Sequence, residues 1–277
     1  MSRRHELEQR LRKLGEIGEI MRSMKNLALM ETRKLARFLD VQEAAVREIE
    51  AVAADFLHFH PHLGVQPSGK QALLVIGAER GFCGDFNEEL LHELHAPMSS
   101  ASAILAVGGK LGNRLEHHPE LAGQFDGPAV AEDVPKTLNL LIPAIGQLQE
   151  TQACQGLNVL HHRSGLEGVA RKPLLPPFTE HLGLTPVPGH PPLLNLAPEA
   201  FFAELVHHYL FAALHEIFYT SLMAENQRRI QHLEGAIQRL EEKTEVLART
   251  SRTLRQEEIT EEIEVILLSV EGAVKWS

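Results

Sequence analysis

The apolar residues in the last third of the chain recur every three or four positions. This spacing persists from residue 199 to residue 271, and no proline follows Pro198. It predicts one long helix with a narrow apolar seam that needs a second helix as partner. At roughly 1.5 Å per residue, such a helix would extend on the order of 100 Å. The predicted seam is Ile230, Leu233, Ile237, Leu240, Thr244, Leu247, Ser251 and Leu254, followed after a one-residue slip by Ile259, Ile263, Ile266 and Val270.

The first sixty residues predict another long helix, from residue 6 to about residue 58. No proline occurs before Pro61, and most apolar steps are again three or four residues. Gly15 and Gly18 interrupt the pattern, and each costs roughly 1 kcal/mol relative to alanine inside a helix. They mark either a close approach of another backbone or two tolerated weak points. The apolar face consists of Leu7, Leu11, Leu14, Ile17, Met21, Met24, Ala28, Leu35 and Leu39.

Between these helices the pattern changes to short apolar runs. Residues 72–76, 103–107 and 157–161 have the length and composition of buried strands, and residues 85–95 and 134–149 predict helices. Strands that alternate with helices indicate a small, Rossmann-like α/β domain with a largely parallel sheet.

Together these segments predict an α/β protein with long helices, in which helices from the two ends form an antiparallel coiled coil. The expected parts are residues 1–60 and 199–277 for the coiled-coil helices, 70–175 for the inserted α/β domain and 176–198 for a connection rich in proline and glycine. An alternative folds both helices back onto the α/β domain. The seam lengths favour the coiled coil, because that domain is too small to cover both seams.

The charge is unevenly distributed along the chain. The formal net charge of −10 argues against a nucleic-acid-binding protein. Residues 1–37 contain ten lysines and arginines against five acidic residues, whereas residues 38–197 contain nine against eighteen. The basic end is therefore expected to face an acidic surface. Two cysteines and no signal peptide indicate a reducing compartment, and no apolar run is long enough to span a membrane.

Two short stretches resemble ligand sites but lack a necessary part. His58, His60 and His62 alternate, yet nothing nearby completes a metal coordination shell. Gly64–Lys70 fits G-x-x-x-x-G-K, but Gln71 stands where a phosphate loop needs serine or threonine, and the stretch precedes a strand instead of following one. We therefore expect no metal and no phosphate loop here.

A third stretch, Gly108, Gly109 and Gly112, follows the second predicted strand. It lacks the G-x-G-x-x-G spacing and the downstream acidic residue of a dinucleotide site, so tight-turn geometry explains it better. No cofactor is expected.

Three motifs occur in a characteristic order. Leu11–Lys34 reads LRKLGEIGEIMRSMKNLALMETRK, Ala78–Asn87 reads AERGFCGDFN, and Arg255–Ile263 reads RQEEITEEI, with Gly272 and Ala273 beyond it. In these stretches the chain resembles the γ subunit of F-type ATP synthases, the central rotor shaft. That family has a similar first helix, the turn S-D-R-G-L-C-G-x-x-N, the signature R-Q-x-x-I-T-x-E-[IL] and a Gly-Ala pair near its C-terminus.

The chain also departs from that family's pattern. Where the family has S-E-x-x-A-R-M, Ala224–Ile230 reads AENQRRI and retains only the glutamate and the second arginine. Charged heptads replace an Ala/Asn-rich stretch, and Ser23-Met24 stands in place of Ala-Met. The resemblance is therefore to a divergent member.

The resemblance implies a non-catalytic shaft inside a ring of α and β subunits, with the α/β domain near the membrane c-ring and an ε subunit as a further partner. It implies coupling of ion flow to ATP synthesis or hydrolysis, at the cytoplasmic face of the plasma membrane without membrane insertion. No nucleic acid is expected as partner. The implied rotor–stator contacts are Met24, Lys25, Glu225, Arg229, Gln256, Thr260 and Glu262.

Other assignments follow from the same resemblance or from charge. Met24 also fits packing in the seam, and Arg229 and Glu262 also fit a solvated helical face. Cys83 is expected to pack as a small apolar residue. The turn is expected to be shaped by Arg80, Gly81, Cys83 and Gly84, and acidic ring loops are expected to meet Arg22, Lys25, Arg33 and Lys34.

Two other classes of function compete with the shaft. A nucleotide-binding α/β enzyme with helical arms needs a complete phosphate loop and a positioned acid–base pair. A coiled-coil scaffold would pair its helices between molecules instead of within one.

Overall fold

Two long helices dominate the computed structural model, which describes residues 3–65, 69–94, 101–152, 154–165, 168–179 and 190–274. They are α1 (Arg3–Phe59) and α5 (Pro198–Val274). The chain forms two compact units, one of residues 1–27 and 231–277 and the other of residues 28–230. Each unit contains part of both helices, so the α/β domain shares its unit with helical segments that the predicted division had placed outside it.

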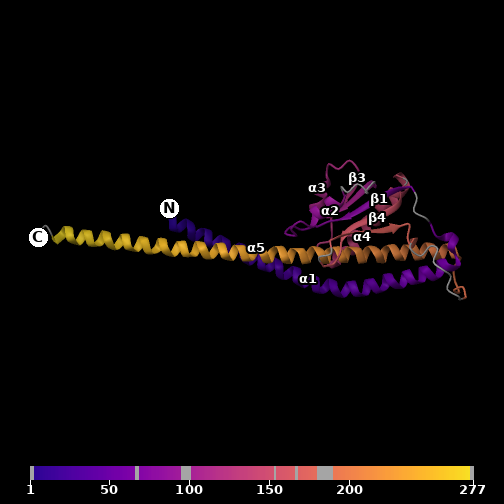
Figure 1. Ribbon diagram of the computed structural model, residues 1–277, viewed down its shortest axis with the longest axis horizontal. Helices are drawn as coiled ribbons and strands as arrows, with labels where there is room; N and C mark the ends of the chain where they lie inside the picture. The colour runs from indigo at the N-terminus through magenta and orange to yellow at the C-terminus, as the bar shows by residue number, and fades with distance from the viewer. Residues whose placement is uncertain are drawn as a thin grey trace. The chain divides into compact units, whose positions relative to one another are not determined.

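In the first unit, α1 and α5 pair in opposite directions. Successive residues of α1 meet earlier and earlier residues of α5, so the two helices run antiparallel within one molecule (Figure 1). This arrangement confirms the predicted coiled coil. The cross-helix ion pairs are Arg4–Glu258 at 2.8 Å, Arg22–Glu241 at 2.9 Å and Lys25–Glu234 at 3.3 Å.

The seam of this coil follows the predicted positions only in part. Along α5 the predicted seam positions from Leu233 to Leu254 are buried or half-buried. The last half-buried residue on this side of the helix is Glu258. The predicted continuation was wrong for this chain, because Ile259 and Ile263 are 47% and 52% exposed. On α1, Gly18 is buried, whereas Ile17, which was predicted to lie on the apolar face, is exposed. The side chain of Val270 lies outside the described residues.

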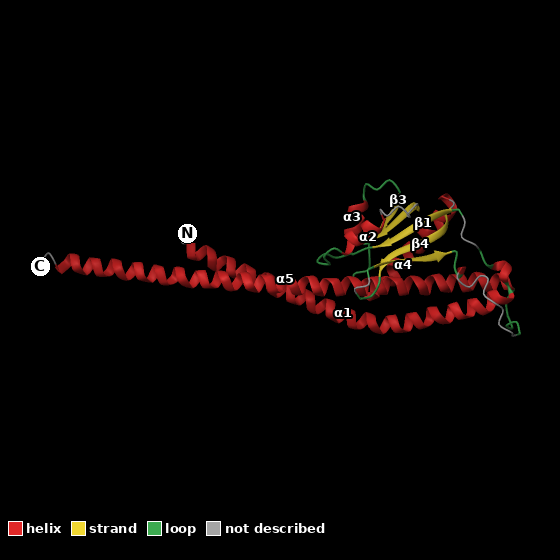
Figure 2. Ribbon diagram, viewed as in Figure 1, coloured by secondary structure: helices red, strands yellow, loops and turns green. Residues whose placement is uncertain are grey.

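The second unit contains a five-stranded sheet in the order β3-β2-β1-β4-β5, drawn yellow in Figure 2. Strands β3, β2, β1 and β4 are parallel, and β5 pairs antiparallel with β4. The strands are β1 (Lys70–Ile76), β2 (Ala101–Val107), β3 (Leu121–Phe125), β4 (Cys154–His162) and β5 (Val169–Leu175). The short helix η1 (Pro61–Leu63) precedes β1, and the helices between the strands are α2 (Phe86–Leu94), α3 (Gly109–Leu115), η2 (Ala131–Asp133) and α4 (Val134–Gln152).

The predicted largely parallel α/β domain is confirmed, with two differences. The sequence patterns missed β3 and β5, which lie at the two edges of the sheet and lack continuous apolar runs. The glycine stretch predicted only as a tight turn opens α3, although Gly108 itself takes a turn conformation with φ at 108°. Residues 180–189 of the predicted proline-rich connection, which was placed at residues 176–198, lie outside the described residues.

Alternate strand residues face two separate cores, which makes three layers in this unit (Figure 1). On one face α4 and the adjoining segments of α1 and α5 cover the sheet, and on the other face α2 and α3 do. The first core includes Leu74, Leu105, Val159, Leu138, Phe56 and Phe218, and the second includes Leu73, Val75, Ile104, Phe86, Leu90 and Leu111.

Candidate functional site

The turn that follows β1 is tightly constrained. Its backbone is left-handed at Phe82, with φ at 65°, and at Gly84, with φ at 62°. A left-handed conformation is uncommon for a bulky residue such as phenylalanine and costs on the order of 1–3 kcal/mol. Asn87 accepts the amide hydrogen of Ala78 through Oδ1 at 2.9 Å and so closes the start of the turn. The surrounding fold therefore holds this segment in one strained shape.

A buried ion pair on α5 supplies that support. Arg229 and Glu225 stand one helical turn apart, are both almost fully buried, and bond to each other through Nη2 and Oε1. Arg229 also donates from Nε to the Gly81 carbonyl at 3.2 Å and from Nη2 to Cys83 Sγ at 3.1 Å. Glu225 accepts the Arg80 amide hydrogen at 3.4 Å. The pair thus bonds α5 to three residues of the turn.

Ionisation in this cluster follows from its burial. Burial raises the pKa of Glu225, against the opposing effect of Arg229. Burial, followed by the charge of Glu225, raises the pKa of Cys83 to about 12. A thiol with this pKa stays neutral at physiological pH and is a poor nucleophile. Cys83 therefore does more than fill space, because it bonds to Arg229, but it carries no thiolate chemistry.

The structure gives Glu225 and Arg229 an internal role. With 4% and 5% of their surface exposed, they present no surface to a partner subunit, unlike the rotor–stator contact expected of them. Sequence reasoning had also considered a solvated helical face for Arg229, and the burial rules that out. The sequence analysis did not single out Asn226, whose Oδ1 accepts a hydrogen bond from Arg229 Nη1 at 3.0 Å.

The other expected contact residues lie in two separate places in the first unit. Met24 and Lys25 are half-buried beside the segment of α5 around Glu234. The exposed residues Gln256, Thr260 and Glu262 lie around and beyond Glu258. The two groups are therefore not brought together, because Glu258 pairs with Arg4, about six helical turns from Met24.

Most of the basic residues expected to meet acidic ring loops are paired within this chain. Arg22 binds Glu241 and Lys25 binds Glu234 in the first unit. In the second unit Lys34 binds Glu132 at 2.7 Å. These pairs are accessible to water, so each contributes roughly 0–1 kcal/mol to stability. Arg33 is exposed.

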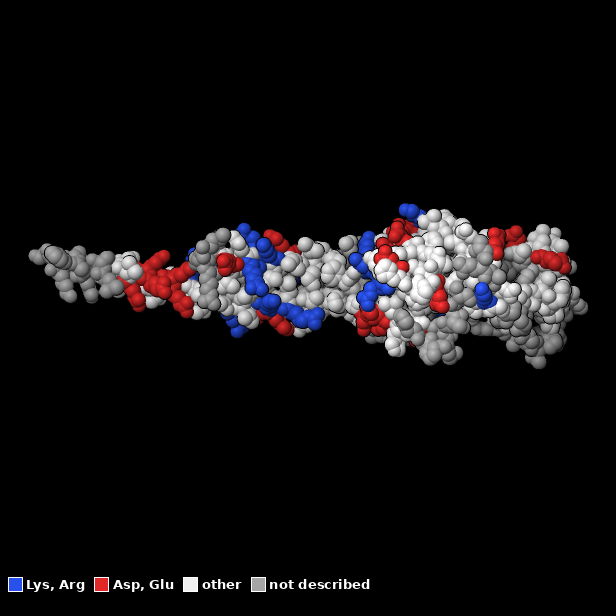
Figure 3. Space-filling view, turned by 90° about the horizontal axis from the view of Figure 1, so that it is seen from above, with Lys and Arg blue, Asp and Glu red and all other residues white. Residues whose placement is uncertain are grey.

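The stretch of α5 beyond the paired seam is acidic on its surface. Residues 257–264 contain five glutamates and no lysine or arginine. Figure 3 shows acidic side chains as a red group near the C-terminal end of α5. The exposed apolar residues Ile259, Ile263 and Val265 alternate with them. This stretch therefore carries both acidic and apolar groups on its surface.

The usual ligand crevice of the α/β fold is filled by α5. In open parallel sheets, ligands bind where neighbouring strands send their connections in opposite directions, here between β1 and β4. Ser221 of α5 lies there, with its hydroxyl 3.5 Å from the Ile76 carbonyl at the end of β1. Gln227 accepts the amide hydrogen of Gly165 beyond the end of β4 at 2.8 Å. The helix occupies the place that a nucleotide would need.

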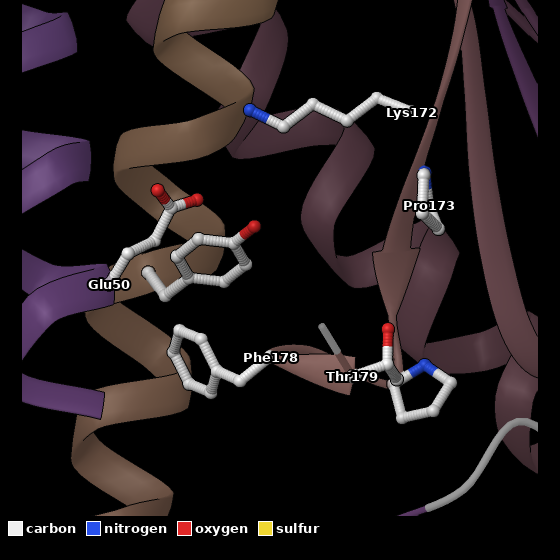
Figure 4. Close-up of a pocket in the computed structure, with 7 residues that line it drawn as sticks. Glu50, Lys172, Pro173, Phe178 and Thr179 are labelled. Carbon is white, nitrogen blue, oxygen red and sulfur yellow. The ribbon is translucent and has the colours of Figure 1, made fainter. Parts of the chain in front are cut away.

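A separate small cavity lies among α1, β5 and α5. Its volume is about 80 Å³. Figure 4 shows Glu50 from α1 and Lys172 from β5 directed toward the same space, with Phe178 and Thr179 on its border. Lys172 binds Glu216 of α5 at 3.0 Å. A cavity of this size holds two or three waters at most, since ligand pockets measure roughly 300–1,000 Å³. It is too small to be a ligand pocket of ordinary size.

Among the described residues, no cluster of three or more histidine, cysteine or acidic side chains is arranged to hold a metal ion. No helix within the described ranges combines the length and the hydropathy that a bilayer span requires.

Comparisons with known proteins extend over nearly the whole chain. A family model described as ATP synthase matches residues 3–272. The ATP synthase gamma chain of Frankia casuarinae is 26% identical, with 95% of each chain covered, and that of Saccharopolyspora erythraea is 24% identical, with 98% of each covered. A chain in the Euglena gracilis mitochondrial ATP synthase OSCP/F1/c-ring structure has a TM-score of 0.68 at 14% identity, covering 97% of this chain and 94% of its own length. A chain in the Tetrahymena thermophila central stalk/c-ring structure has a TM-score of 0.56 at 16% identity, covering 78% and 99%.

Proposed function

This chain belongs to the ATP synthase γ-chain family, and from that membership we propose that it works as the central rotor shaft of an F-type ATP synthase. Its partners are then the α and β subunits of the catalytic ring, the ε subunit and the membrane c-ring. We propose that it is a non-catalytic subunit, and we place the nucleotide chemistry in the neighbouring ring. Its location is peripheral, at the cytoplasmic face of the plasma membrane.

One observation carries this proposal, the antiparallel pairing of α1 and α5 within one chain. A shaft that transmits torque must resist twisting, and two helices joined by a seam and cross-helix ion pairs resist it better than one helix does. As an asymmetric shaft turns, it contacts the surrounding sites differently. Each site then adopts the conformer, and the nucleotide affinity, that its contact favours.

We place the contacts with the ring at Met24, Lys25, Gln256, Thr260 and Glu262. The last three are exposed on α5 next to the apolar residues Ile259 and Ile263, where a partner surface has direct access. Glu225 and Arg229 are not part of this set, because they are buried against the turn after β1.

The two competing functions fit the geometry less well. An enzyme that binds nucleotide on its α/β domain needs the crevice between β1 and β4, where Ser221 of α5 lies. A scaffold needs helix pairing between molecules, whereas Arg22 of α1 meets Glu241 of α5 in the same molecule.

A cysteine crosslinking experiment tests the proposal in the assembled complex. The full chain, carrying Thr260→Cys, is produced with its α and β subunits, one of which carries a cysteine on the ring wall. A link between shaft and ring should stop ATP hydrolysis, and reduction should restore it. Unchanged hydrolysis in the linked complex, or failure of the chain to assemble with the ring, would overturn the proposal.

The matched control is a link inside the shaft. Arg22→Cys and Glu241→Cys, joined by a short bis-maleimide, should connect the two helices of one molecule and leave hydrolysis unchanged. At high dilution the isolated variant should give only this internal link. A covalent dimer would instead support the scaffold.

A further inference from the structure

One side chain joins the ends of three parallel strands. Glu79 lies in the turn after β1, and its Oε2 atom accepts the amide hydrogens of Gly109 and Gly127, each at 2.7 Å. Gly109 follows β2 and Gly127 follows β3. A single carboxylate oxygen therefore holds three consecutive connections at the carboxyl edge of the sheet, all within the second unit.

The backbone around this carboxylate is built from glycines that approach closely. A Cβ on Gly108, whose φ is 108°, would lie 2.6 Å from the Gly77 carbonyl oxygen. A Cβ on Gly127 would lie 3.1 Å from Gly108 Cα and 3.3 Å from Glu79 Cβ. Side chains at these positions would push the amide groups away from the oxygen that they bind.

Backbone amides that converge at this edge of a parallel sheet are a common way to bind anions. Here the anion comes from the chain itself. We propose that the backbone amides of Gly109 and Gly127 form an anion-binding cradle, that Glu79 is its built-in ligand, and that the cradle accepts a small free carboxylate when this side chain is removed. The proposal does not depend on the rotor function.

The cradle also explains how the turn is held from both sides. The Glu79 side chain ties it to the connections after β2 and β3. The next residue, Arg80, donates its amide hydrogen to Glu225 of α5. Hydrogen bonds to an ionised carboxylate are stronger than neutral ones, and two amides without an acceptor would destabilise the folded state. Glu79 is thus a positioning residue for the turn.

Chemical rescue of a truncated side chain tests this inference in the full chain. Glu79→Ala should lower the thermal unfolding midpoint by about 3–8 °C in sodium chloride. An equal concentration of sodium acetate or formate should restore at least half of that loss. Glu79→Gln keeps an oxygen in the cradle and leaves no room for acetate, so its midpoint should be the same in both salts.

The matched control removes a carboxylate that binds no backbone amide in the cradle. Glu88 is exposed on α2 and pairs with Arg114 at 2.7 Å. Glu88→Ala should change the midpoint little and should not respond to acetate. A second readout is amide hydrogen exchange at Gly109 and Gly127, which should speed up in Glu79→Ala and slow again in acetate.

Equal midpoints and equal exchange rates of Glu79→Ala in acetate and chloride would overturn the inference. If this variant does not fold in chloride, its refolding yield is compared in the two salts. A higher yield in acetate supports the cradle, and equally low yields reject it. An acetate response of the same size in Glu88→Ala would also reject it, because the effect would then be a general salt effect.

Discussion

Gly18 of α1 lies directly against Leu240 of α5, so close that a Cβ on Gly18 would be 3.0 Å from Leu240 Cδ2. One turn earlier, a Cβ on Gly15 would have no neighbouring atom within 4 Å. The sequence left two explanations open for both glycines. The structure assigns the close approach to Gly18 and the tolerated weak point to Gly15, although the neighbour of Gly18 is a side chain and not the expected backbone.

Opposite effects on stability are therefore expected at the two glycines. Gly15→Ala should raise the free energy of unfolding by about 1 kcal/mol, because alanine favours the helix and meets no neighbour. Gly18→Leu should lower it by about 1–3 kcal/mol, because the new side chain overpacks the seam against Leu240. Urea titration followed by helical circular dichroism measures both. A neutral Gly18→Leu would show that the two helices do not meet at this level.

The buried pair of Glu225 and Arg229 should behave as one unit. Arg229→Met leaves a buried carboxylate without its cation and should cost about 3–5 kcal/mol. The double variant Glu225→Gln/Arg229→Met should cost less than the sum of the two single changes, because neither charge is then left alone. Denaturant unfolding of the three variants gives the coupling free energy. Additive losses would contradict the paired geometry.

Stability at alkaline pH should depend on Cys83. Its pKa is about 12 in the folded chain against an ordinary value of 9.0. Between these values the unfolded chain loses a proton that the folded chain keeps, so the unfolded state binds fewer protons and stability falls as pH rises. The loss should approach about 3–4 kcal/mol across this window. Unfolding measured from pH 9 upward should show a shallower slope for Cys83→Ala. Identical slopes would contradict the raised pKa.

Stability in mild acid should depend on two buried histidines of β4. Burial lowers the pKa of His161 and of His162 below the ordinary value of 6.5. As pH falls below 6.5, the unfolded chain takes up protons that the folded chain does not, so stability is lost toward acid. His162 also bonds to the Phe86 carbonyl through Nε2 at 2.8 Å.

Substitution of these histidines should flatten the acid response. The free energy of unfolding of His161→Gln and of His162→Gln should vary less between about pH 5 and 7 than that of the unchanged chain, whatever its absolute value. Fluorescence-detected urea titration at several pH values measures this dependence. A variant as acid-sensitive as the unchanged chain would contradict the assignment.

The elements that could be predicted are those with a strong local period. The heptad-like steps from Leu233 to Leu254 and the apolar runs of β1, β2 and β4 encode their own conformation, because each pattern needs only neighbours along the chain. The edge strands β3 and β5 bury fewer of their residues, so their sequences lack that signal. The seam beyond Glu258 was predicted wrongly, because an apolar period does not reveal where the partner helix stops.

The candidate site could be predicted only in outline. The motif around Cys83 located the turn, and the motif around Arg229 located a point on α5. A glutamate and an arginine four residues apart have the same sequence pattern whether their helix face is exposed to solvent or buried, so the pattern does not predict burial. Glu79 was overlooked, because its partners Gly109 and Gly127 are distant in sequence.

The amino-acid sequence by itself determined the two long helices, the inserted α/β domain and the family, since periodicity and short motifs are local properties of the chain. Only the tertiary structure decided that Glu225 and Arg229 lie inside, that α5 fills the crevice between β1 and β4, and that Glu79 joins three strand ends. These are contacts between residues far apart in sequence. Their burial and bonding depend on which surfaces meet, and no local pattern contains that information.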